Sequence, residues 1–364
     1  MRAPVNLTLT ITLCIISILL SGCPPPLEHF AYRGGAGRAG VSAPTALAGK
    51  EAWRLKLSGG TLAPAAANRE FLVLGTVDDA INVLDLSTGR ILSSYRTGGD
   101  LAADPVLTAN RAFIGCMDGF LYALNLGSGK PAWKTDLGAP LAASPALTQR
   151  GIYAADTKGR LTKLSTGGKV LWRAELGGAI YAAPEVEGRT VYVNLYSGKL
   201  VALSTKDGMP LWDYSGAGEL SAAPCVIADR VVIADRLGNV TALSTEGKGV
   251  IWTTNLKRVI EADISARTDR IFAACLDGRI YCLSLSDGSQ LWVNDLGSPI
   301  QGGTALWGNQ LFAATTNGNL WVLSAGDGAR LYQQSLNGEI IAAPTLTPQG
   351  IVVVLADGGV VLVK

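Results

Sequence analysis

The sequence predicts an all-β fold: an eight-bladed β-propeller of four-stranded blades, closed by an N-terminal strand that pairs into the last blade. Each repeat contains four short strand-like runs separated by turns, and none shows helical periodicity. Repeats of about 40 residues with four strands each are typical of propellers rather than solenoids. The repeat is marked by a glycine that returns in steps of 39 or 40 residues, at Gly119, Gly159, Gly198, Gly238, Gly278, Gly318 and Gly358.

The third repeat illustrates the order of the strands. Strands are expected over residues 141–147, 151–156, 160–164 and 169–172. Asp-Gly and Asn-Gly pairs join the second and third strands in several repeats, because glycine adopts the positive φ that such tight turns require. In the first repeat Asp79 stands at this position, which predicts a slightly strained turn. Asp78 beside it has no third ligand nearby in the sequence, so no metal site is expected.

The number of inner strands gives the number of blades. The last repeat has only three strands before the chain stops at Lys364. Residues 49–53 match residues 129–133 and supply the missing outer strand, and this closure protects strand edges that an open stack would expose. The inner strands are expected to begin near Leu62, Leu101, Leu141, Ile180, Leu220, Ile260, Ile300 and Ile340.

The N-terminus has the pattern of a targeting segment, with Arg2 followed by an apolar run over residues 7–20. The run is short for a membrane-spanning helix, although an uncleaved anchor stays a second interpretation. Residues 20–23 resemble a bacterial lipobox, which implies that Cys23 is acylated after cleavage. The expected organisation is a signal peptide at 1–22, a Pro/Gly/Ala-rich tether at 23–48 and the propeller at 49–364. Pro24 after the cysteine implies an outer-membrane anchor with the propeller facing the periplasm.

Composition excludes several classes of function. Hydrophobic residues make up 48% of the chain and charged residues 16%. The net charge of +2 does not indicate the basic stripe that binding to nucleic acid requires. The one histidine, His29, lies in the expected tether, which removes Ser-His-Asp triads, Cys-His dyads and histidine zinc sites from the folded domain. We therefore expect neither an enzyme nor a bound cofactor. The cysteines of the ring are expected to be buried free thiols: Cys116, Cys225, Cys275 and Cys282.

A large aromatic residue recurs near the end of most repeats. A residue repeated in every blade has the same structural role each time, so these rings are expected to pack between adjacent blades. Trp307 and Trp321 lie off this register and are also expected to be buried. The recurring residues are Trp133, Trp172, Trp212, Trp252, Trp292 and Tyr332.

Departures from the repeat are the places where a symmetric scaffold can carry an asymmetric site. Inner strands usually contain two small residues and a proline, but residues 256–264 replace this pattern and the glycine-rich connection before it. Two interpretations stay open: a solvated charge cluster beside the channel mouth, or a partner-recognition patch. Asp104, four blades from Asp263, is expected to be too far away for paired acid and base chemistry. The candidate partner-binding residues are Lys257, Arg258, Glu261, Asp263, Gln301 and Tyr181.

The unit from Asp118 to Trp133, Asp-Gly-x-Leu-Tyr-Ala-Leu-x4-Gly-x3-Trp, resembles the pyrroloquinoline-quinone-type propeller repeat. With the lipobox, the tether and the closing strand, the chain resembles the BamB-type outer-membrane protein assembly factors. That resemblance implies a non-enzymatic scaffold that binds a BamA-like barrel subunit during outer-membrane protein insertion. The arginine-centred and paired-aspartate motifs of that family are not intact here, and Glu261 and Asp263 correspond to the acidic pair only loosely.

Two other classes of function stay open. The chain could be a lipoprotein that binds another protein or a cell-wall polymer. Quinoprotein dehydrogenases share the eight-bladed repeat, but the resemblance to them implies a vicinal cysteine pair, calcium ligands and long covering loops. The sequence has no Cys-Cys pair and only short connections between its strands.

Overall fold

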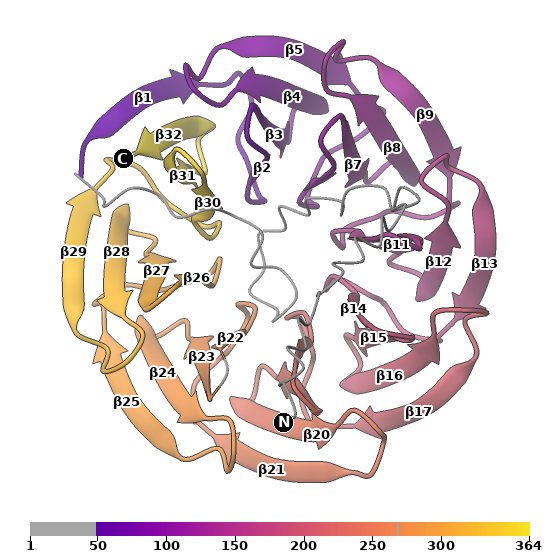
Figure 1. Cartoon of the computed structure of the whole chain (residues 1–364), viewed down its shortest axis with the longest axis vertical. Helices are drawn as coiled ribbons and strands as arrows, with labels where there is room; N and C mark the ends of the chain where they lie inside the picture. Colours follow the sequence, from indigo (N-terminus) through magenta and orange to yellow (C-terminus); the bar gives the residue numbers. More distant parts are fainter. Residues whose placement is uncertain (1–48, 268) are drawn as a thin grey trace, which may run out of the picture.

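The computed structural model describes residues 49–267 and 269–364, which form a ring of eight antiparallel four-stranded sheets (Figure 1). The predicted fold class is confirmed. The expected signal peptide, tether and lipidation site at Cys23 lie outside the described residues. Within the described ranges, no helix is long and apolar enough to cross a membrane.

Each blade runs from a short inner strand to a long outer strand. The innermost strands are β2 (Ala66–Ala67), β6 (Val106–Leu107), β10 (Ala146–Thr148), β14 (Glu185–Glu187), β18 (Cys225–Ile227), β22 (Ser265–Arg267), β26 (Thr304–Trp307) and β30 (Thr345–Thr347). The second strands are β3 (Phe71–Thr76), β7 (Arg111–Gly115), β11 (Gly151–Ala155), β15 (Thr190–Leu195), β19 (Arg230–Ala234), β23 (Arg270–Ala274), β27 (Gln310–Ala314) and β31 (Gly350–Val354).

The third strands are β4 (Ala80–Asp85), β8 (Phe120–Asn125), β12 (Arg160–Leu164), β16 (Lys199–Ser204), β20 (Asn239–Ser244), β24 (Arg279–Ser284), β28 (Asn319–Ser324) and β32 (Gly359–Val363). The outer strands are β1 (Glu51–Lys56), β5 (Ile91–Arg96), β9 (Pro131–Asp136), β13 (Val170–Glu175), β17 (Pro210–Ser215), β21 (Val250–Asn255), β25 (Gln290–Asp295) and β29 (Arg330–Ser335). We number the blades by their inner strands, so that blade 1 begins at β2 and blade 8 at β30.

The expected starts of the inner strands were wrong by four or five residues. The segment from Leu141 to Pro145, for example, is a loop, and the hydrogen-bonded strand begins only at Ala146. Proline lacks the N–H that a ladder needs, so the strand starts after it. The small residues before each inner strand therefore form loops beside the central channel.

The N-terminal strand closes the ring as predicted. β1 pairs with β32, with Trp53 opposite Leu362 and Leu55 opposite Val360, and Figure 1 shows the two strands side by side. Lys50 and Lys364 exchange two backbone hydrogen bonds, of 3.0 and 2.9 Å. Blade 8 thus joins the start of the described chain to its last residue.

The hydrophobic core lies in the seams between neighbouring blades. The second and third strands of each blade are almost continuously buried, as in β11, because both faces of each sheet are covered by adjacent sheets. The outer strands alternate between exposed and half-buried residues, as in β17. Tight turns have the expected backbone, and Asp79 adopts φ +64° where other repeats place glycine.

The recurring tryptophans cross the seams, as predicted. In the seam between blades 3 and 4, the Trp172 ring packs on Gly208, which has φ +76°, and its indole N–H donates to the carbonyl of Thr205 at 3.3 Å. Trp53, Trp133, Trp212, Trp252 and Trp292 make the same contacts to the next blade.

Two seams and the two off-register tryptophans differ from this pattern. Tyr332 packs on Gly49 and donates to its carbonyl at 3.2 Å, whereas Ser93 stands at the aromatic position between blades 1 and 2.

Trp321 is buried as expected. Trp307 is only partly buried, at the end of β26, where it packs against the core between blades 7 and 8.

The four described cysteines are buried thiols outside any disulfide, as predicted. Burial in the apolar seams raises the pKa of the Cys116, Cys275 and Cys282 thiols to about 12. These groups are therefore neutral thiols in the folded protein at physiological pH.

Substituting Gly208 by alanine should destabilise the ring by about 2–4 kcal/mol, because a Cβ there would meet the Trp172 ring at 2.7 Å and φ is left-handed. Gly127→Ala is the matched control, since nothing lies within 4 Å of its Cβ and the change should stay within about 0.5 kcal/mol. Urea unfolding of both variants measures the difference; equal midpoints would contradict the seam contact.

The buried thiols should not react with a thiol reagent at pH 8 until the protein is unfolded. Because their folded pKa is raised above the unfolded value of 9.0, their stabilising contribution is complete below pH 9 and is lost as pH rises toward 12. Titration of residues 24–364 with the thiol reagent, in the native state and in denaturant, measures how many thiols react in each state. Rapid modification of the native protein would show that the seams are open.

Candidate functional site

Loops from all eight blades surround one mouth of the central channel. The cavity there has a volume of about 180 Å³, and its exposed lining is mostly polar. It is lined by Leu62, Ala63, Pro64, Ala102, Asp104, Ala142, Ser144, Tyr181, Ala182, Ser221, Glu261, Ala262, Asp263, Gln301, Gly302, Ile341 and Ala342. Side chains therefore differ around the mouth even though the backbone repeats.

The structure brings together four of the six candidate partner-binding residues. Tyr181, Glu261, Asp263 and Gln301 all line the channel mouth. Gln301 is exposed, whereas Glu261 and Asp263 are half-buried. Lys257 and Arg258 lie outside this cavity, on the connection between β21 and β22.

The connection that holds Lys257 and Arg258 departs from its counterparts in both charge and backbone. Lys257 has φ +56°, at a position where Gly138, Gly177 and Gly297 stand in other connections. Its amide donates to the Asn255 side chain at 2.6 Å, which fixes the turn. The Arg258 guanidinium pairs with Asp277 of the neighbouring turn at 2.7 Å. The two cations are thus held on the rim, with the Lys257 side chain exposed.

Charged and aromatic side chains continue from the channel mouth across blades 4 to 6. Arg236 bridges two carboxylates: it pairs closely with Glu261 and lies 3.4 Å from Glu219. We define the mouth patch as Tyr181, Tyr196, Glu219, Arg236, Lys257, Arg258 and Glu261.

The aromatic part of the mouth patch is a pair of tyrosines. Tyr181 is 46% exposed and packs edge-to-face on Tyr196, with ring centroids 5.4 Å apart. A hydrogen bond to Glu219 raises the pKa of Tyr196 and links the rings to the ion pairs. Exposed tyrosine and arginine are residue types in which protein interfaces are enriched.

Asp263 joins two blades rather than standing free at the mouth. Its carboxylate accepts a hydrogen bond of 2.6 Å from the backbone amide of Ala223, in blade 5. At the equivalent place in blade 2, the Asp104 amide donates to the Ser144 hydroxyl of blade 3 at 2.9 Å. This position of the loops therefore links neighbouring blades.

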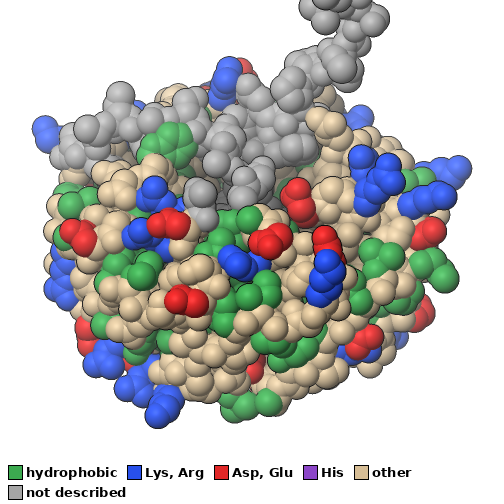
Figure 2. Space-filling model, turned by 60° about the horizontal axis from the view of Figure 1, so that its bottom comes forward, with side chains coloured by type: hydrophobic (Ala, Val, Ile, Leu, Met, Phe, Trp, Pro, Cys, Tyr) green, Lys and Arg blue, Asp and Glu red, His purple; other side chains and the backbone are tan. Residues whose placement is uncertain are grey.

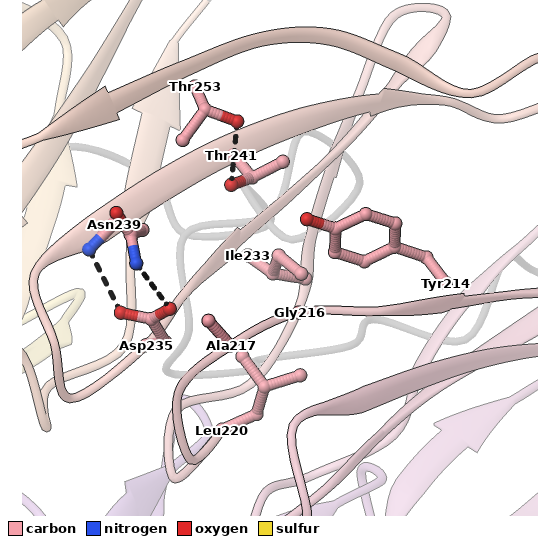
Figure 3. A pocket seen from close by; sticks show the side chains of 9 residues that line it. All are labelled: Tyr214, Gly216, Ala217, Leu220, Ile233, Asp235, Asn239, Thr241 and Thr253. Carbon is pink, nitrogen blue, oxygen red and sulfur yellow. Dashed lines mark hydrogen bonds between the residues drawn. The ribbon is translucent and has the colours of Figure 1, made fainter.

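Sequence reasoning missed a second cavity, between blades 4 and 5 (Figure 3). It has a volume of about 180 Å³ and opens on the face that carries the turns between second and third strands. We call it the seam pocket. Its lining residues are Tyr214, Gly216, Ala217, Leu220, Ile233, Asp235, Asn239, Thr241 and Thr253.

A missing side chain contributes to the space in the seam pocket. The Gly216 amide donates to the carbonyl of Gly198, and six leucines make the equivalent bond in other seams. Those leucines belong to the hydrophobic clusters of their seams, but Gly216 contributes no side chain to the cluster between blades 4 and 5. The leucines are Leu57, Leu137, Leu176, Leu256, Leu296 and Leu336.

The third strand enlarges the same pocket. Thr241 stands at the position that Tyr122, Tyr281 and Trp321 occupy in blades 2, 6 and 7. A break in the leucine pattern at Gly216 was therefore the sequence signal for this pocket.

Charge on the molecular surface is mixed. Figure 2 shows acidic and basic side chains close to one another on the face that it presents, without a continuous basic stripe. Within the described ranges, no group of three or more His, Cys, Asp or Glu residues could hold a metal ion.

Comparison with known proteins gave one family and a set of similar structures. A family model described as outer membrane protein assembly factor BamB matches residues 117–276, 218–292 and 276–363, more than half of the chain. No curated protein sequence matches the chain.

The similar structures share the fold at low sequence identity. The computationally designed protein Ika8 has a TM-score of 0.78 at 16% identity and covers 87% of this chain and 100% of its own. BamB from Moraxella catarrhalis has a TM-score of 0.73 at 18% identity, covering 86% and 96%. The quinohemoprotein alcohol dehydrogenase ADHIIG from Pseudomonas putida HK5 has a TM-score of 0.72 at 13% identity, covering 85% and 73%.

Proposed function

Because the chain belongs to the family described as outer membrane protein assembly factor BamB, we propose that it is a non-enzymatic scaffold for the assembly and insertion of outer-membrane β-barrel proteins. In this proposal Cys23 carries a lipid anchor in the outer membrane and the propeller faces the periplasm. Its partner is the BamA-like subunit that carries out barrel insertion.

The mouth patch is the observation that supports a binding role. Over most of the ring the blades repeat the same seam contacts, but across blades 4 to 6 the loops and turns of this face carry an edge-to-face pair of tyrosines and a chain of ion pairs. Because these charges are partly exposed, each pair contributes little to stability, on the order of 0–1 kcal/mol. Their arrangement fits electrostatic matching to a partner better than stabilisation of the fold.

Similarity to the quinohemoprotein alcohol dehydrogenase shows the shared fold alone, because identity is 13%. The channel cavity of about 180 Å³ is smaller than the roughly 300–1,000 Å³ typical of pockets for ligands of drug or cofactor size. A lipoprotein that binds a different protein or a cell-wall polymer is the alternative, and the affinity experiment below separates it from barrel assembly.

Affinity purification of the full-length protein from detergent-solubilised native membranes should recover a BamA-like subunit. Reversing three charges of the mouth patch, with Lys257→Glu, Arg258→Glu and Glu261→Lys, should reduce that recovery at least tenfold, because charges that attracted the partner would repel it. Asp263 is left unchanged because it joins blades 5 and 6.

The matched control makes the same charge changes on the opposite face, in the turns before β17 and β21: Lys206→Glu, Lys248→Glu and Glu246→Lys. This variant should recover the subunit as the wild type does. If the wild type recovers only unrelated proteins, barrel assembly is the wrong function; if both variants lose the subunit equally, the mouth patch is the wrong surface.

A further inference from the structure

We propose that the seam pocket binds an alkylammonium group, supplied either by a lysine side chain of a protein or by a small free amine. The inference rests on the geometry of the pocket and not on the identity of the partner proposed above. It gives a chemical role to the one seam in which the repeated leucine is replaced by glycine.

The shape of the seam pocket fits a short aliphatic chain that enters end-on. Its volume of about 180 Å³ corresponds to roughly six water molecules. Leu220, Ile233 and Ala217 provide an apolar wall against which a methylene stem can pack. In Figure 3 Ile233 lies between Asn239 and the Tyr214 ring, and Ala217 and Leu220 lie below it.

The polar groups of the seam pocket are mostly hydrogen-bond acceptors, or hydroxyls that can accept. Asp235 is 5% exposed, and one of its carboxylate oxygens accepts the amides of Leu237 and Asn239. Its other oxygen, Oδ2, accepts one bond, from the Asn239 side chain at 2.8 Å. A carboxylate has about four acceptor positions, so this oxygen can accept a further donor.

The hydroxyls supply the remaining acceptors. Thr241 and Thr253 lie 3.1 Å apart and share one hydrogen bond, and the Tyr214 hydroxyl projects into the same space (Figure 3). A lysine-type ammonium carries three donors and no acceptor, which matches the carboxylate, the threonine pair and the phenol. The Tyr214 ring adds an aromatic surface that attracts a cation.

The charge of the seam pocket selects against other ligands. Among its lining residues Asp235 is the one charged group, so a ligand carboxylate or phosphate would be repelled. Arg236 follows Asp235 in the chain, but its guanidinium is engaged by Glu219 and Glu261 of the mouth patch. A neutral alcohol could still donate a hydrogen bond to Asp235, but it would lose the attraction between the ligand's positive charge and the carboxylate.

Titration with n-butylammonium, followed by NMR chemical-shift changes, tests the proposal on the wild-type protein. We expect saturable binding that is at least tenfold tighter than that of n-butanol, a neutral probe of the same length. Binding of the two probes with equal affinity would overturn the assignment of an ammonium site.

Gly216→Leu restores the leucine of the other seams and should abolish n-butylammonium binding. The substitution is compatible with the fold, because the nearest atoms to its Cβ are at 3.4 Å and Gly216 is not among the residues with positive φ. Tyr214→Phe keeps the ring but removes the hydroxyl and should weaken binding about tenfold. The control is Tyr95→Phe at the equivalent position of blade 1, which should leave binding unchanged.

The source of the ammonium group is resolved by the affinity purification described above. If Gly216→Leu also loses the co-purified subunit, the ligand is a lysine of that partner; if it loses only n-butylammonium, the ligand is a free amine. Unchanged n-butylammonium binding in both Gly216→Leu and Tyr214→Phe would refute the site. That result leaves the barrel-assembly proposal standing, because recovery of the subunit by the wild type tests it separately.

Discussion

The ring depends on one contact repeated from blade to blade, the packing of an outer-strand aromatic on a left-handed glycine of the next blade. A tryptophan contributes apolar burial, and its indole N–H pairs with a backbone carbonyl across the seam, as Trp252 does with Leu285 at 3.0 Å. Truncating such a side chain typically costs about 3–5 kcal/mol. Because β1 completes blade 8, the contact continues through Tyr332 and Trp53 across the closure of the ring, and only the seam between blades 1 and 2, with Ser93, lacks it.

The ring becomes asymmetric where residues that recur from blade to blade are replaced. Ser93 removes the aromatic between blades 1 and 2, Gly216 removes a leucine between blades 4 and 5, and Lys257 replaces a glycine between blades 5 and 6. The last two departures lie on neighbouring seams and on the same face as the mouth patch. A scaffold that buries its seams uniformly can carry such local changes, because each blade contacts only its neighbours.

Much of the fold could be predicted from the sequence, because glycine turns, strand patterns and tryptophans repeat at fixed spacing. The closing strand followed from the match between residues 49–53 and 129–133. The starts of the inner strands were wrong because proline and small residues resemble a strand but form loops. The seam pocket was missed because Thr241 lies on β20 whereas Tyr214 and Gly216 lie on β17 and directly after it, and only the fold brings these two segments together.

Site-specific photo-crosslinking in native cells tests most directly whether binding concentrates on the face of the mouth patch. A crosslinker at Tyr181 or Leu237, which are 46% and 57% exposed, should capture the BamA-like subunit. One at Met209, 63% exposed in the turn before β17 on the opposite face, should not. Capture from Met209 with none from Tyr181 or Leu237 would contradict the account.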